Sequence, residues 1–276
     1  MTSTRRTITL VLSILGLLAL PAVASANVNG KLDKAANALD AAVAAAEDRG
    51  DAAAFKANMR AAHKYTAKAE RKARKAKGKV KKAKLLRKVA RQYDANLNEY
   101  ADLIALVPPS LQLPVVDAIG LSAEARERVV AFLVRIAEKL PEPARTAVLD
   151  AIAKFETDGD IMALFEALVS EDVTDPVKQH LLDKIEMITG HVSDVLESLK
   201  GLTGMLPPQA AGVVNQAISM IQGHLGELST MIQEIFDGFG FGGGNGGGWF
   251  GGGFGLGSIC NLLDGFPIPI PLPFCD

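Results

Sequence analysis

Thirteen basic residues lie close together between positions 64 and 88, and they are the strongest candidates for a chemical role. A dense row of positive charge repels itself unless a polyanion neutralises it, and the release of counterions makes such binding favourable and sensitive to salt. We therefore predict that this block binds anionic partners through Lys64, Lys68, Arg71, Lys72, Arg74, Lys75, Lys77, Lys79, Lys81, Lys82, Lys84, Arg87 and Lys88.

The sequence leaves several partners open for this block. An anionic envelope polymer, a lipid surface and extracellular nucleic acid all carry suitable charge. Base-specific recognition is not expected, because Tyr65 is the one aromatic residue within the block that could stack on a base. The block could also be a solvated helix face that binds nothing in particular.

Charge is divided unevenly along the chain. Residues 27–91 hold 19 Lys or Arg against 6 Asp or Glu, a net charge of +13, whereas residues 92–276 hold 9 against 25, a net charge of -16. The whole chain, at -1, hides this division. The separation suggests a second function class, a structural protein that self-associates by pairing its basic and acidic halves.

The N-terminus has the three parts of a secretory signal peptide. Arg5 and Arg6 precede an apolar run from Ile8 to Leu20, and the small residues Ala24, Ser25 and Ala26 follow. We expect cleavage before Asn27, a secreted or cell-envelope location, and no transmembrane helix in the cleaved protein, since no later segment is apolar for long enough.

Catalytic and metal-binding patterns are not found in the sequence. The four histidines, at 63, 180, 191 and 224, do not share a metal-ligand spacing, and no nucleophile or phosphate-binding motif occurs. The sequence therefore predicts a non-enzymatic protein without cofactor or metal. A third alternative is a helical glycan hydrolase that uses two carboxylates, for which Glu171 and Asp172 are an example of a pair.

Residues 27–107 form a basic region rich in Ala, Lys and Leu, a composition that strongly favours helix. Gly50 with Asp51, and then Gly78, are the natural breaks. We predict a helical hairpin or three-helix unit here. Its clearest apolar seam consists of Leu86, Val89, Tyr93, Leu97, Tyr100 and Ile104, which recur at spacings of three and four.

Residues 108–237 are predicted to form an acidic helical bundle. We expect Ser122 to cap a helix that ends at Leu140, and Pro143 to open the next. A further helix is expected over Asp158 to Val169, and Asp175 is expected to cap a longer helix. The last helix carries a heptad seam from Val214 to Ile235, interpreted as packing within the bundle rather than as an oligomer interface.

The C-terminal segment changes character. In residues 238–257, 13 of 20 are Gly, and the others include the only Trp and four Phe, which indicates a disordered, flexible tether. Residues 258–276 are rich in Pro, and Cys260 and Cys275 are expected to form a disulfide that closes this tail. The fold predicted for the whole chain is an all-α, multi-helix bundle with this disordered tail.

Overall fold

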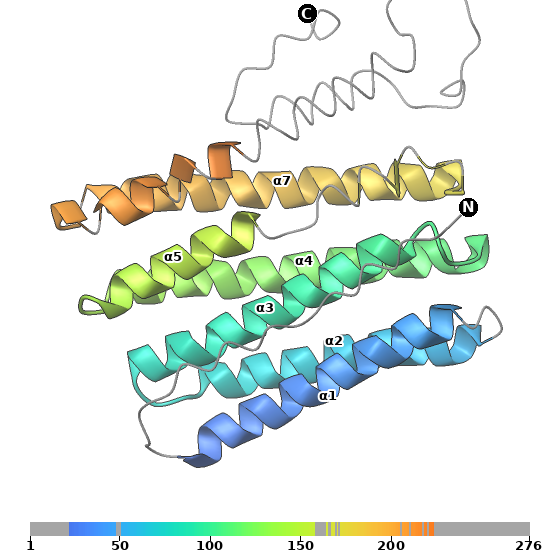
Figure 1. Ribbon diagram of the computed structural model, residues 1–276, viewed down its shortest axis with the longest axis horizontal. Helices are drawn as coiled ribbons and strands as arrows, with labels where there is room; N and C mark the ends of the chain where they lie inside the picture. Colours follow the sequence, from blue (N-terminus) through green and yellow to red (C-terminus); the bar gives the residue numbers. More distant parts are fainter. Residues whose placement is uncertain are drawn as a thin grey trace, which may run out of the picture.

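The computed structural model describes residues 22–47, 51–157 and, with short gaps, 164–223. This part of the chain is all-α, as predicted, and contains no strand (Figure 1). The helices with defined bounds are α1 (Ala22–Glu47), α2 (Ala52–Arg74), α3 (Lys79–Leu103), α4 (Pro109–Ala137), α5 (Ala144–Thr157) and α7 (Asp175–Thr203).

The helices lie roughly along one axis and stack in layers, with α1 and α2 below α3 and α4 and with α5 and α7 above them (Figure 1). Successive helices from α1 to α5 run antiparallel. Helix α7 instead runs parallel to α4, because the Gln112 side chain near the start of α4 bonds the backbone of Asp172 and Thr174 just before α7 begins. Because α1, α2 and α3 run antiparallel in turn, the α2–α3 turn lies at the same end of the bundle as the start of α1.

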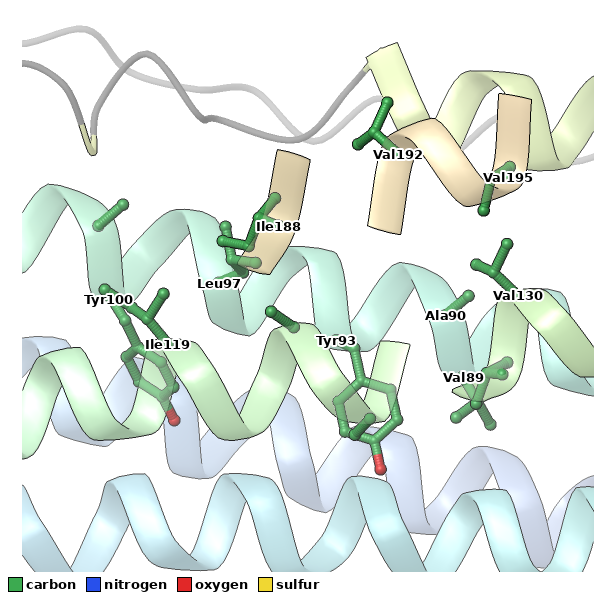
Figure 2. Close-up of a cluster of buried hydrophobic side chains, with 14 of the residues drawn as sticks. Val89, Ala90, Tyr93, Leu97, Tyr100, Ile119, Val130, Ile188, Val192 and Val195 are labelled. Carbon is green, nitrogen blue, oxygen red and sulfur yellow. The ribbon is translucent and has the colours of Figure 1, made fainter. Parts of the chain in front are cut away.

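One hydrophobic core joins the basic and acidic regions. Figure 2 shows where α3, α4 and α7 meet. The seam predicted for α3, Leu86 to Ile104, is buried at every position, and Ile119 of α4 and Ile188 of α7 are buried too. The cluster continues across the turn between α3 and α4, so the two regions fold against each other.

The N-terminal region is the three-helix form of the prediction, α1 to α3. Asp51 begins α2 as expected, and its carboxylate accepts a hydrogen bond of 2.8 Å from the Ala54 amide. Gly78 begins α3 with a φ of +82°, a conformation that residues with a Cβ rarely adopt. Both predicted breaks therefore fall at helix boundaries, although Gly50 itself lies outside the described residues.

The expectation that Ser122 begins a helix is wrong. Helix α4 begins at Pro109 and continues through Ser122, which is fully buried and whose hydroxyl has no hydrogen-bond partner among the described residues. Pro109 needs no amide partner in the first turn, and Pro114 inside the helix forfeits one backbone bond. The apolar residues Leu111, Val115 and Ile119 extend the buried stripe upstream of Ser122, and their packing outweighs that loss.

The later elements are confirmed in part. Helix α5 begins directly after Pro143, as predicted. Thr174 occupies the N-cap position of α7, one residue before the predicted Asp175, and its side chain makes no capping hydrogen bond. Of the heptad seam, Val214, Ile218 and Ile221 are buried. The rest of that seam, most of Asp158 to Val169, residues 1–21, the Gly-rich tract and the Cys260–Cys275 pair lie outside the described residues.

Candidate functional site at the α2–α3 turn

The thirteen predicted residues lie on the C-terminal half of α2, on the turn after it and on the first three turns of α3. None is buried. The half-buried members are Lys68, Arg74, Lys81, Lys82 and Arg87, and the exposed members are Lys64, Arg71, Lys72, Lys75, Lys77, Lys79, Lys84 and Lys88. We call the exposed members from Arg71 to Lys88 the basic end.

Two lysines of the basic end bind the start of α1. The Lys72 ammonium donates to the Asn27 side-chain oxygen at 3.0 Å, and the Lys88 ammonium donates to that of Asn29 at 3.1 Å. Both partners are neutral, so these contacts fix the place where α1 joins the basic end and leave the positive charge uncompensated.

Arg74 differs from the other members because it points into the helix interface. Its Nε donates to Glu70 Oε1 at 2.8 Å, and its Nη2 donates to the backbone oxygen of Arg128 at 3.2 Å. The guanidinium carbon also lies 4.5 Å from the centre of the Phe132 ring, a cation–π contact. Arg74 therefore links α2 to α4 and stabilises the fold.

Glu70, the single acidic residue between Lys56 and Arg91, completes this junction. Its second oxygen accepts a hydrogen bond of 3.1 Å from the Tyr93 hydroxyl of α3. Burial raises the pKa of Tyr93, and the charge and hydrogen bond of Glu70 raise it further, while Arg128 and Arg74 act in the opposite sense. The Glu70 carboxylate thus joins α2 to α3 directly, and Arg74 extends this junction to α4.

Two other contacts tie α3 to the acidic region. Arg87 is half-buried beside α5; burial lowers its pKa, Arg91 adds to that shift, and Asp150 opposes it. Deeper in the bundle, Arg126 of α4 forms a buried ion pair with Asp94 of α3. The acidic region therefore meets α3 at Arg87 and Asp94.

The exposed lysines and Arg71 are different. Within the part of the chain that the structure describes, Arg71, Lys75, Lys77, Lys79 and Lys84 form no ion pair. They are free to meet an external anion.

The dipoles of α2 and α3 have opposite effects on the positive charges at the two sides of this turn. Arg71, Lys72 and Arg74 occupy the last turn of α2, where the partial negative charge of a helix C-terminus favours cations. Lys79, Lys81 and Lys82 occupy the first turn of α3, which holds no acid, where the positive helix end disfavours them. Lys79 is exposed and forms no ion pair among the described residues, so the fold gives no reason for its charge at this helix end. Residues that oppose local stability are often functional.

A groove of about 380 Å³ lies between α2 and α4, away from the turn. Its walls include Met59, Leu121 and His63, whose buried Nδ1 has no hydrogen-bond partner in the part of the chain that the structure describes. Burial and the charge of Arg128 lower the pKa of His63, and Glu70 opposes them. Asp117 is the one carboxylate that lines this groove, whereas a glycoside hydrolase needs two.

The residues that sequence reasoning missed are the partners of Arg74. Glu70 could have been predicted as a partner, because it is the single acidic residue within a basic block. Phe132 and Arg128 could not, since they lie more than 50 positions away and meet α2 only in the folded bundle.

No group of three or more metal-ligating side chains occurs among the described residues. No helix in the same residues is apolar over a sufficient length to cross a bilayer. Of the pair Glu171 and Asp172, the first lies outside the described residues and the second is exposed in a turn.

Comparison with known proteins gives a fold and no family. No protein-family model matches the chain, and no curated protein matches its sequence. One solved chain, from the computational design of self-assembling cyclic protein homooligomers, superposes with a TM-score of 0.58. It shares 15% sequence identity, and the match covers 78% of each chain. This likeness concerns the helical architecture alone.

Proposed function

We propose that this chain is an exported, non-enzymatic interaction protein whose basic end binds anionic polymers or membrane surfaces electrostatically. The observation that carries the proposal is the gathering, on both sides of the α2–α3 turn, of exposed lysines that form no ion pair with the described residues. Among them, Lys79 lies in the first turn of α3 and opposes its dipole, so the fold alone gives no reason for its charge. Attraction of this kind depends on charge and not on the sequence of the partner.

The test compares two triple variants of equal charge. One replaces Lys75, Lys77 and Lys79 by Gln, and the matched control replaces the exposed cations Lys34, Arg60 and Lys200 by Gln. Binding to polyphosphate and to anionic vesicles is measured from low to high salt. We expect the first variant to bind more weakly and with a shallower salt dependence, and the control to retain most of its affinity. If the unaltered protein binds neither probe at low salt, the proposal is wrong.

A second candidate function is self-association through opposite charges. Acidic side chains gather at the end of the bundle opposite the α2–α3 turn, where burial raises the pKa of Glu99 and the charges of Asp102 and Asp40 raise it further. A basic end and an acidic end on one bundle favour head-to-tail pairing of copies. The designed neighbour belongs to a set of self-assembling homooligomers, but at 15% identity it bears on the fold only.

Sedimentation at low and high salt separates the two functions. Head-to-tail pairing predicts a mass that falls toward the monomer as salt rises, because ions screen the attraction over a Debye length of about 8 Å at 0.15 M. A mass that is constant across salt would contradict self-association and leave the binding of external anions untouched.

A further inference from the structure

The basic end carries an exposed apolar residue at its tip. Val80 is 53% exposed and follows Lys79 directly, in the first turn of α3. Single exposed apolar residues are common on protein surfaces and need no explanation by themselves. At this place, however, a soluble polyanion would gain nothing from Val80, whereas the boundary between lipid head groups and acyl chains would accept it.

The course of the chain gives a second, independent observation. The apolar run from Ile8 to Leu20 is separated from α1 by Pro21 alone. The second turn of α1 in turn lies against the basic end, through the bonds from Lys72 to Asn27 and from Lys88 to Asn29. Before the expected cleavage ahead of Asn27, an apolar run held in a bilayer would therefore bring the start of α1, and the basic end with it, to the head groups.

The opposite end of the bundle gives the orientation. Glu99, Asp102 and Asp40 gather there, and an anionic surface repels them. Leu106, in the turn between α3 and α4 at that end, is 61% exposed and so resembles Val80 in chemistry but not in position.

We propose that the basic end meets an anionic phospholipid bilayer end-on, with Val80 entering the head-group region among the lysines. This inference rests on the proposed function and narrows it to one partner. The lysines supply long-range attraction to anionic head groups. Val80 supplies an apolar contact that is favourable only at a surface with an apolar interior.

The experiment uses tryptophan as a depth reporter. Trp249 is the only tryptophan, so replacing it by Phe gives a silent background into which Val80→Trp or Leu106→Trp is introduced. The protein is taken as the host cell produces it, with its N-terminus read by mass spectrometry. Vesicles of phosphatidylglycerol with phosphatidylcholine, vesicles of phosphatidylcholine alone, and polyphosphate are the three probes.

We expect the emission of the Val80→Trp protein to shift to the blue on phosphatidylglycerol vesicles and to stay unchanged on polyphosphate. The emission of the Leu106→Trp protein should not shift on any probe. Replacing Lys75, Lys77 and Lys79 by Gln should weaken the partition to phosphatidylglycerol vesicles roughly 100-fold, about fivefold for each lysine. Partition to phosphatidylcholine alone should not change with those lysines.

Each contrary result has its own meaning. Binding to polyphosphate without binding to anionic vesicles would overturn this inference and keep the proposed function. Equal blue shifts at positions 80 and 106, or an equal shift on polyphosphate, would overturn the end-on contact. Vesicle binding that is indifferent to the three lysines would overturn the inference, and failure to bind either probe would remove the proposed function as well.

Discussion

The two helices that meet at the α2–α3 turn carry the same charge at opposite ends of their dipoles. On the α2 side, Arg74 is enclosed by Glu70 and Phe132, and the dipole favours the cations of the last turn. On the α3 side, Lys79 is exposed and the dipole disfavours it. One block of similar residues in the sequence thus contains charges that stabilise the fold, such as Arg74, and charges that do not, such as Lys79.

The largest expected effect concerns Asp94, the residue of α3 that forms a buried ion pair with Arg126 of α4. Asp94→Asn leaves the Arg126 guanidinium buried without its carboxylate, and we expect a loss of about 3–5 kcal/mol in unfolding free energy. Urea denaturation measures it. The exposed pair of Arg128 with Glu124 is the control, and Glu124→Gln there should cost at most about 1 kcal/mol. Similar costs for both variants would contradict the contrast.

The next effect tests the α2 side of the turn itself. Arg74→Gln removes the bonds to Glu70 and to the Arg128 backbone, and we expect a loss of about 1–3 kcal/mol. Lys75→Gln, one position along and exposed, is the matched control and should change stability by less than about 0.5 kcal/mol. A destabilised Lys75→Gln protein would show that the exposed lysines also hold the fold.

Periodicity and capping were sufficient to predict much of this fold from sequence. The seam from Leu86 to Ile104 and the breaks at Asp51 and Gly78 are local signals, and all three are confirmed. The prediction at Ser122 is wrong because serine is a common N-cap residue, whereas packing against distant helices continues α4 through this position.

The candidate site divides in the same way. The row of lysines is visible in the sequence, but the special role of Arg74 depends on a backbone oxygen 54 positions away. The i,i+4 spacing of Glu70 and Arg74 is a short-range signal for their ion pair. The contacts of Arg74 with α4 have no such signal, because they form only when α4 packs against α2.

A pH effect tests the interior of the α2 side. Burial and Arg128 lower the pKa of His63, so the unfolded chain takes up a proton at a higher pH than the folded one does. Stability should therefore fall as the pH drops below the ordinary histidine value of 6.5, by less than the Arg74→Gln effect because the ring is partly exposed. Denaturation at pH 7.5 and pH 5.5 measures the loss, and His63→Gln should reduce it. An unchanged pH dependence in that variant would show that other groups cause it.

The smallest effect, and the one with opposite sign, tests the α3 side. Lys79→Glu places an acid in the first turn of α3, where the helix dipole favours negative charge, and we expect unfolding free energy to rise by about 0.5 kcal/mol at low salt. The same change should weaken binding to anionic probes, because it reverses a charge on the basic end. Urea denaturation and vesicle binding on one preparation measure both quantities. A gain in stability with a loss of binding would show that Lys79 serves binding and not folding, because residues that serve binding often lower the free energy of unfolding. A variant that is less stable yet binds as before would place Lys79 with Arg74, among the charges that hold the fold.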